Sequence, residues 1–370
     1  MGLFQVEGWN LDSKKVLFDD AGKRTKSKKT KEHKSKSRKA DINVEQLSSK
    51  PAESAQREVQ VDRKRKHKDD EGRPVKRTSN QENAGPPKKK ALTALQQKML
   101  AKLTGSRFRW INEQLYTISS DDAVKLIQEQ PQLFDEYHDG FRSQVQTWPE
   151  NPVNVFMQQI SQRAIKPVNA PGGLPGLKDK KVVIADMGCG EAQLSLEVSR
   201  FFQQGKKTFR KIAVQVHSFD LKKVNNRITV ADIRNVPLPD NSCSIVIFCL
   251  SLMGTNFLDF IKEAYRLLTP RGELWIAEIK SRFSDNTGDE FVNALKLNGF
   301  FHKKTDAENK MFTRFEFFKP PKEIIEERKA KLERKQKFVE VETEKEELNN
   351  KRAKLPEGKW LLKPCLYKRR

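Results

Sequence analysis

The chain has few of the features that mark several common classes of protein. Its 370 residues hold only four cysteines, namely Cys189, Cys243, Cys249 and Cys365. None of them forms a CxxC pair or has a histidine at zinc spacing, which predicts reduced intracellular thiols and no metal site. No apolar run reaches the roughly 18 residues that a membrane span needs. Residues 1–10 lack the basic start and apolar stretch of a secretory signal, so we expect no membrane association.

Large apolar side chains are nearly absent from residues 21–90. This stretch holds 23 Lys and Arg against 10 Asp and Glu, and it cannot bury enough surface to offset chain entropy. We therefore predict a disordered basic tail. Repeated basic runs, such as residues 63–68 and 88–90, favour nuclear targeting and attraction to nucleic acid over a tail that only aids solubility.

The net charge of +23 is concentrated in the flanks. Residues 91–318 hold 30 basic and 25 acidic side chains, a nearly ordinary balance, whereas residues 319–370 hold 17 and 10. Acids and bases alternate at helical spacing over 322–354, which predicts a long, exposed charged helix. The closing apolar residues could dock on the core or on a partner: Trp360, Leu361, Leu362, Leu366 and Tyr367.

The middle of the chain predicts two structural parts. Residues 92–160 are helical in pattern, with a first apolar repeat ending at Gly105 and a helix over 123–129 closed by Pro131. From residue 181, short apolar runs alternate with helical patterns, which indicates a mostly parallel sheet covered on both faces. The expected strands cover 181–186, 214–219, 227–231, 243–250 and 273–278, with a final antiparallel hairpin over 300–304 and 311–318.

The first strand leads into a glycine pair, Gly188 and Gly190. Glycines let the backbone approach a ligand closely, and ligands of such sheets bind at the carboxyl ends of the strands. Asp220 ends the second strand and could bind two ribose hydroxyls, and Asp232 ends the third. A glycine pair alone could be a tight turn, but its combination with two strand-end acids favours a nucleoside-containing ligand.

A nicotinamide dinucleotide is the main competitor for this loop. Its fingerprint requires G-x-G-x-x-G/A, whereas Glu191 lies beside the loop and Gln193 stands where the third small residue should be. A carboxylate there would repel a pyrophosphate. It suits the ammonium and sulfonium of S-adenosylmethionine better, and Asp186 is also placed to attract that positive end.

These motifs resemble those of class I methyltransferases over residues 181–318. More narrowly, residues 92–318 resemble the ribosomal RNA-processing protein 8 family of the nucleolus. The stretches that carry this resemblance are FDEYHDGF at 134–141, ADMGCG at 185–190, FCLSLMGTN at 248–256 and AEIKSRF at 277–283, with LFQVEGW at 3–9 similar to the start of fungal members. The resemblance does not extend through the charged flanks.

The resemblance implies a fold, an activity and a site. The fold is Rossmann-like α/β, with a helical part before the sheet. The activity is S-adenosylmethionine-dependent methylation of adenine N1 in large-subunit rRNA, within pre-ribosomal particles. The residues expected to touch the cofactor are His138, Gly188, Asp220, Asp232, Ile233 and Cys249. Taken by themselves, His138 would be a surface or core histidine, Cys249 a buried small residue and Asp232 a helix cap.

The reaction needs no strong base, because neutral adenine N1 already offers a lone pair. The target base must be unpaired or flipped out, and Phe257, Arg282 and Phe283 are candidates to stack on it. Packing of the two phenylalanines in the core and a surface position for Arg282 are equally open. Two alternatives remain: a cofactor-binding nucleolar or chromatin scaffold without essential catalysis, and a nuclear methyltransferase of a non-RNA substrate.

Five segments follow from these patterns. They are a short motif at 1–20, the basic tail at 21–90, a helical lid or substrate-side region at 91–178, the S-adenosylmethionine-binding core at 179–320, and a charged helix with a C-terminal tail at 321–370. We expect a monomer located in the nucleus and nucleolus.

Overall fold

The computed structural model describes residues 93–205, 212–285, 287–334, 337–365 and 367. The predicted N-terminal motif and the whole basic tail lie outside these residues. Among the described helices, none is long and apolar enough to cross a membrane.

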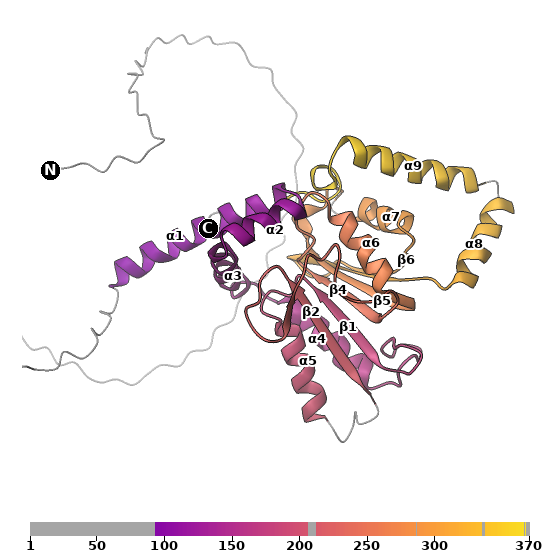
Figure 1. Ribbon diagram of the computed structural model, residues 1–370, viewed down its shortest axis with the longest axis horizontal. Helices are drawn as coiled ribbons and strands as arrows, with labels where there is room; N and C mark the ends of the chain where they lie inside the picture. Colours follow the sequence, from indigo (N-terminus) through magenta and orange to yellow (C-terminus); the bar gives the residue numbers. More distant parts are fainter. Residues whose placement is uncertain (1–92, 206–211, 286, 335–336, 366, 368–370) are drawn as a thin grey trace, which may run out of the picture. The chain divides into compact units, whose positions relative to one another are not determined.

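Four helices precede the sheet (Figure 1). They are α1 (Ala94–Thr117), α2 (Ser120–Glu129), α3 (Gln132–Val145) and α4 (Pro152–Ala164). Gly105, where the sequence predicted the first helical pattern to end, does not end the helix, because α1 continues through it. A glycine costs a helix only about 1 kcal/mol relative to alanine, and the second half of α1 is anchored by the fully buried Phe108 and Ile111.

The central sheet has seven strands in the order β3-β2-β1-β4-β5-β7-β6. Five are parallel: β1 (Val182–Met187), β2 (Val214–Asp220), β3 (Ile228–Val230), β4 (Cys243–Cys249) and β5 (Leu268–Ile279). The antiparallel hairpin of β6 (Phe301–Asp306) and β7 (Phe312–Phe318) completes the sheet beside β5. Strand order reverses between β1 and β4, and the ligands of open parallel sheets bind at such a position.

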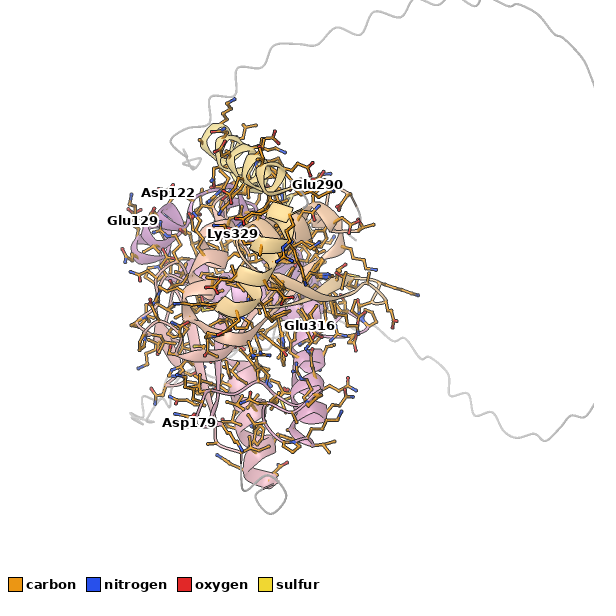
Figure 2. The ribbon with its side chains drawn as sticks, turned by 90° about the vertical axis from the view of Figure 1, so that its right-hand side faces the viewer. Asp122, Glu129, Asp179, Glu290, Glu316 and Lys329 are labelled. Carbon is orange, nitrogen blue, oxygen red and sulfur yellow. The ribbon has the colours of Figure 1, made fainter. Side chains whose placement is uncertain are left out.

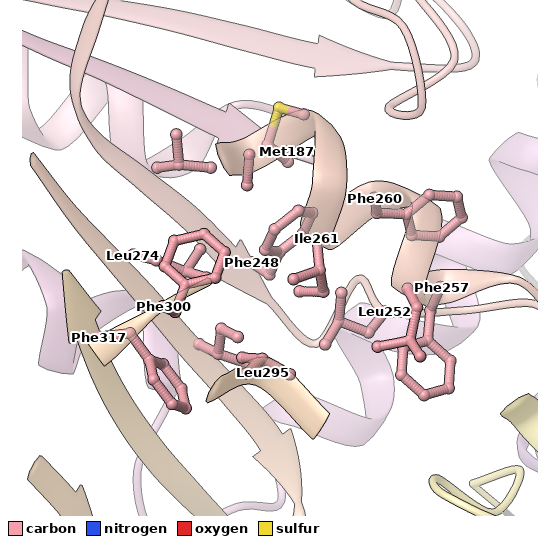
Figure 3. Packing of buried hydrophobic residues seen from close by; sticks show 14 of the residues in the cluster. Met187, Phe248, Leu252, Phe257, Phe260, Ile261, Leu274, Leu295, Phe300 and Phe317 are labelled. Atoms are coloured by element: carbon pink, nitrogen blue, oxygen red, sulfur yellow. The ribbon is translucent and has the colours of Figure 1, made fainter. Parts of the chain in front are cut away.

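Helices cover both faces of the sheet (Figure 1). On one face, α4 and α5 (Gln193–Gln204) pack on alternate strand residues such as Ile184 and Trp275. On the other face lie α6 (Phe257–Leu267) and α7 (Asp289–Leu297), packed on residues such as Phe248 and Leu274 (Figure 3). The predicted parallel sheet covered on both faces is therefore confirmed.

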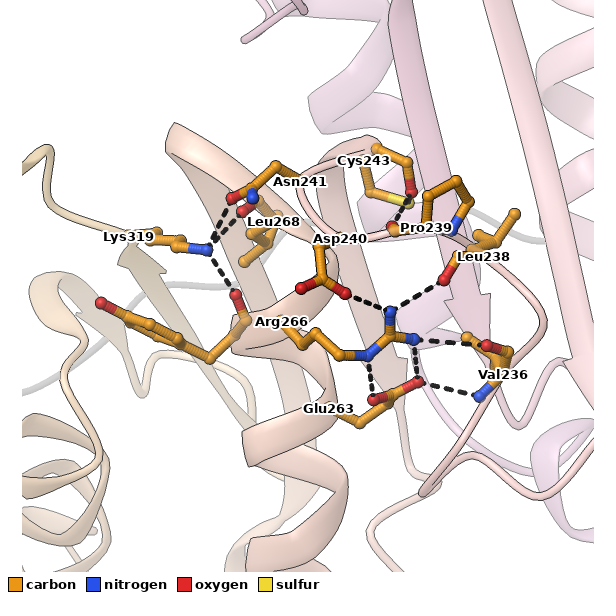
Figure 4. Close-up of polar contacts among 12 residues, drawn as sticks. Val236, Leu238, Pro239, Asp240, Asn241, Cys243, Glu263, Arg266, Leu268 and Lys319 are labelled. Atoms are coloured by element: carbon orange, nitrogen blue, oxygen red, sulfur yellow. Dashed lines mark hydrogen bonds and ion pairs between the residues drawn. The ribbon is translucent and has the colours of Figure 1, made fainter.

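The loop before β4, at the amino end of that strand, is fixed by polar contacts to Arg266 of α6 (Figure 4). Its guanidinium pairs with Glu263 at 2.6 Å and with Asp240 at 2.7 Å, and it donates to the Leu238 carbonyl at 2.8 Å. Charged side chains such as those of Glu129 and Asp179 project from the periphery of the molecule (Figure 2).

The predicted single charged helix at 322–354 is wrong in detail. Two helices occupy this stretch, α8 (Lys322–Arg334) and α9 (Phe338–Lys354). No side chain of α8 is buried, whereas α9 buries Leu348 against the core. The apolar residues that follow dock on the core, since Leu361 and Leu362 are buried in the same cluster as α6 and α7.

Candidate active site

A cavity of about 450 Å³ lies at the carboxyl ends of the parallel strands. Side chains from α1 to α5 line it together with the ends of β1, β2 and β4. All six residues that the sequence predicted to touch a cofactor line this one cavity: His138, Gly188, Asp220, Asp232, Ile233 and Cys249. They come from α3 and from four different strand ends, so the fold brings together residues that are up to 111 positions apart.

The loop after β1 depends on its two glycines. Gly188 has a φ of +74° and Gly190 a φ of +58°, backbone conformations that other residues rarely adopt. A Cβ on Gly188 would lie 2.5 Å from the Cβ of Ser251, and a Cβ on Gly190 would lie 3.2 Å from Nε2 of His138. The glycines therefore provide both the turn and the space for neighbouring groups at the cavity.

Asp220 holds the glycine loop from the end of β2. One carboxylate oxygen accepts from the backbone N–H of Gly190 at 2.6 Å, and the other accepts from the N–H of Leu221 at 2.8 Å. Burial raises the pKa of this carboxyl, and His138 and the two backbone donors oppose that rise. Each oxygen keeps acceptor capacity for a further donor, such as a ribose hydroxyl.

His138 lies on α3, which passes over the glycine loop. Its Nδ1 is 2.8 Å from the carbonyl of Phe134, so Nδ1 carries the proton and Nε2 faces Gly190. The rings of Phe134 and His138 are 4.1 Å apart. The resemblance implied that this histidine touches the cofactor, and it lines the cavity beside the glycine loop.

Asp232 is already engaged by a neighbour. Its carboxylate accepts from the backbone N–H of Arg234 at 2.9 Å and from that residue's Nε at 3.0 Å. Arg234 also pairs with Asp121 of α2. Through Arg234, Asp232 therefore connects the end of β3 to α2, one of the three helices α1–α3 that we call the lid helices. Asp232 also lines the cavity.

Two further groups meet near the end of β4. Burial raises the pKa of the Cys249 thiol well above its ordinary value, so this cysteine is a neutral thiol and not a nucleophile. Asp186 in β1 is 3% exposed and lines the cavity. Burial, and then the charge of Asp220, raises the pKa of the Asp186 carboxyl to about 7.

The cavity is acidic. Among the described lining residues, five carry a carboxyl group, namely Asp186, Glu191, Glu197, Asp220 and Asp232, whereas Arg142 is the one arginine or lysine. Arg142 pairs with Glu191 and with Asp139, which neutralises part of the charge at the mouth. Such a cavity disfavours phosphates and favours a ligand with positive charge.

Three ion pairs join the lid helices to the sheet side of the cavity. They are Arg142–Glu191, Lys222–Asp135 and Arg234–Asp121. At least one partner in each pair is well exposed, and exposed pairs contribute only about 0–1 kcal/mol. These three ion pairs therefore add little to the apolar packing of the lid helices, such as that of Tyr116 against Leu250 and Ile279.

The sequence-based candidates for stacking on an acceptor base are wrong. Phe257 and Arg282 are fully buried and Phe283 is 3% exposed, so none of them is available to a base. The aromatic residues that do line the cavity include Tyr137 and Phe141 of α3, with ring centroids 6.2 Å apart. Both belong to the FDEYHDGF stretch, which was the available signal for them. No group of acidic, cysteine and histidine side chains among the described residues could hold a metal ion.

The strand order, the glycine loop and the strand-end acids define a Rossmann-like methyltransferase of class I. A family model described as "Hypothetical methyltransferase" matches residues 94–335. A solved S-adenosylmethionine-dependent methyltransferase from Aquifex aeolicus is 16% identical and covers 51% of this chain and 98% of its own, with a TM-score of 0.34.

Curated relatives match over much longer stretches. The "25S rRNA (adenine(645)-N(1))-methyltransferase" of Saccharomyces cerevisiae is 65% identical over 100% of both chains. The Schizosaccharomyces pombe protein of the same name is 51% identical over 65% of this chain and 70% of its own. "Ribosomal RNA-processing protein 8" of Dictyostelium discoideum is 42% identical over 75% of this chain and 60% of its own. The chain belongs to this methyltransferase family.

Proposed function

We propose that the chain transfers a methyl group from S-adenosylmethionine to adenine N1 in large-subunit rRNA, within rRNA processing and ribosome biogenesis. The observation that carries this proposal is the full-length match, at 65% identity, to a relative named for that reaction. The acidic cavity at the strand ends supports the choice of donor.

The donor fits the groups that line the cavity. Asp220 would hold the ribose hydroxyls, and Asp232 and Ile233 would meet the adenine. Gly188 and Gly190 would let the methionine part pass close to the backbone, with Asp186 near its positive charge. His138 would close over the bound donor from α3. Bound S-adenosylmethionine supplies an electrophilic methyl group on a sulfonium.

The chemistry needs alignment more than proton transfer. Adenine N1 attacks with its own lone pair, so the protein must hold N1 in line with the methyl carbon and sulfur. The methylated base is cationic, and carboxylates near the end of β4, such as Asp186, would stabilise that charge. The neutral thiol of Cys249 fits beside the transfer point without competing for the methyl group.

The acceptor base must leave its stack and pair, because N1 lies on the Watson–Crick edge. Phe141 and Tyr137 on the lid are the aromatic side chains placed to receive an unstacked base. This assigns the lid helices a role on the acceptor side, in line with the expected region at 91–178.

RNA binding and a nucleolar location belong to the same proposal. The basic surplus of residues 21–90 and 319–370 would attract RNA by neutralising phosphates. The same basic runs would direct the chain to the nucleus, and pre-ribosomal particles would then be its partners. We expect a monomer to suffice, because the described cavity is complete within one chain.

The test is methyl transfer by the purified full-length chain. It is incubated with isotope-labelled S-adenosylmethionine and protein-free large-subunit rRNA, and the nucleosides are analysed by mass spectrometry. We expect labelled 1-methyladenosine with the wild type and none with Asp220→Ala. Donor binding without any labelled nucleoside would favour the scaffold. Label on added nuclear proteins alone would favour a non-RNA substrate.

A further inference from the structure

A fully buried ion pair lies directly behind the cavity. Nη1 of Arg282 is 2.6 Å from Oε2 of Glu278, and both side chains are 0% exposed. The ring of Tyr116 lies 4.6 Å from the guanidinium carbon. Buried pairs of this kind are often no more stabilising than well-packed apolar residues of similar volume. A buried pair at this place therefore invites a role beyond fold stability.

Two further polar atoms of the pair hold the backbone of Leu252. The backbone N–H of Leu252 donates to Oε1 of Glu278 at 3.1 Å, and Nη2 of Arg282 donates to the Leu252 carbonyl at 2.8 Å. The Leu252 side chain points into the buried core (Figure 3). Leu252 is thus fixed through its N–H, its carbonyl and its side chain.

Leu252 is the centre of the loop that follows β4, which we name the acceptor loop (residues 250–254). The other four residues of this loop line the cavity: Leu250, Ser251, Met253 and Gly254. Leu250 has a φ of +60°, a strained conformation for a residue with a branched side chain. Such strain persists only where the surroundings hold the backbone in place, and the hydrogen bonds to Leu252 do this two residues further on.

The C-terminal segment also contacts Arg282, through the backbone of Lys363. Nε of Arg282 donates to the Lys363 carbonyl at 2.9 Å, and the Lys363 N–H donates to the Arg282 carbonyl at 2.8 Å. Asn112 of α1 donates to the Cys365 carbonyl at 2.6 Å. The family match ends at residue 335, so these contacts come from a part of the chain beyond it.

We propose that Glu278 and Arg282 are positioning residues for methyl transfer, and that residues 361–365 are part of the same device. The pair sets the backbone of the acceptor loop, which fixes where the acceptor base lies relative to the donor's methyl group. Arginine suits this task because its planar fork reaches Glu278, Leu252 and Lys363 at once, which a lysine cannot do. This proposal rests on the proposed function.

The test compares two double variants of the full-length chain. Glu278→Gln with Arg282→Met removes both charges at nearly constant volume and leaves the Leu252 carbonyl without its donor. The matched control is Glu273→Gln with Arg163→Met, which removes a pair further from the cavity end of β5, where Nη1 of Arg163 is 2.6 Å from Oε2 of Glu273. Neither control residue lines the cavity.

Two readouts separate positioning from simple stabilisation. Amide hydrogen exchange of the donor-bound protein should be at least tenfold faster at residues 250–254 in the Glu278/Arg282 variant and unchanged there in the control. Single-turnover methyl transfer at a temperature where both are folded should fall at least tenfold in the first variant and less than twofold in the control. Donor Kd should stay within threefold of the wild type in both.

The outcomes are decisive in each case. The proposal would be overturned if a folded Glu278/Arg282 variant exchanged its amide hydrogens at 250–254 at the wild-type rate. A wild-type rate of methyl transfer in that variant would overturn it as well. If that variant does not fold, Arg282→Lys replaces it and should show the same two changes to a smaller extent; no change would overturn the proposal. If the wild type itself methylates no RNA, the proposed function fails, and the exchange comparison still decides whether the pair holds the loop.

Discussion

At the scale of single residues, Asp220 is the group on which the site depends most. It fixes the glycine loop through the N–H of Gly190, and it lies where a ribose would be held. Hydrogen bonds to a charged group contribute about 1.5–3 kcal/mol each, so Asp220→Asn should weaken donor binding by about 10- to 150-fold. Isothermal titration calorimetry measures this.

The control for that substitution is Asp240→Asn. Asp240 is an exposed carboxylate that pairs with Arg266 (Figure 4), and it is not among the residues that line the cavity. Its replacement should leave donor affinity within twofold. Equal losses in the two variants would show that Asp220 acts only through general stability.

A second residue-scale prediction concerns pH. The pKa of Asp186 is raised to about 7 by burial and by Asp220, so the carboxyl is largely protonated at pH 6 and ionised at pH 8. A cationic ligand prefers the ionised form. Donor affinity should therefore rise as pH increases from 6 to 8 and level off above that range, with at most a tenfold change per pH unit.

The same titration on Asp186→Asn isolates this group. Any change that comes from ionisation of the donor itself remains in the variant, and the difference between the two profiles belongs to Asp186. Parallel profiles would mean that Asp186 does not meet the positive end of the ligand.

At the scale of elements, the two halves of α1 differ. The second half packs through Phe108 and Ile111, whereas Leu95, Met99 and Leu103 of the first half are 65%, 63% and 68% exposed. Replacing these three by serine should change the free energy of unfolding by less than about 1 kcal/mol, since exposed substitutions have small effects.

The comparison variant for α1 is Phe108→Ala. It removes a fully buried ring and should lower the free energy of unfolding by about 3–5 kcal/mol. Urea unfolding followed by circular dichroism measures both. A large loss in the triple serine variant would mean that the exposed stripe is covered within the folded chain.

The elements also show what a sequence can and cannot reveal. β1 and β4 were predictable because they are continuous apolar runs, and α6 because its apolar residues recur at helical spacing. The course of α1 through Gly105 was not, because packing of the following turns outweighs one glycine. The burial of Arg282 was hidden for a similar reason, since its partners Tyr116, Leu252 and Lys363 are far apart in sequence.

The same limit applies to the candidate site. The glycine loop and Asp220 follow from spacing and strand ends. His138 was placed by the resemblance alone, because nothing in its own neighbourhood shows that α3 turns back over the sheet. The contact from Asn112 to Cys365 joins residues 253 positions apart, and no local pattern predicts such a contact.

At the scale of the whole molecule, the basic flanks and the cavity have different roles. We expect the flanks to attract RNA through their charge, and the cavity to carry out the methyl transfer. Residues 91–370 should keep wild-type donor affinity after removal of residues 1–90, because the described residues that line the cavity all lie in this later part. The same truncation should weaken RNA binding most at low salt and flatten the dependence of log Kd on log salt concentration. An unchanged salt slope would limit the tail to localisation.

The proposed reaction of this chain makes 1-methyladenosine in large-subunit rRNA. The most direct measurement is nucleoside mass spectrometry of 25S rRNA from Saccharomyces cerevisiae cells that lack the 65% identical relative and express this chain instead. We predict that the wild-type chain restores 1-methyladenosine and that an equally abundant Asp220→Ala variant does not. Unmethylated 25S rRNA in cells that contain the stable wild-type chain would contradict the account.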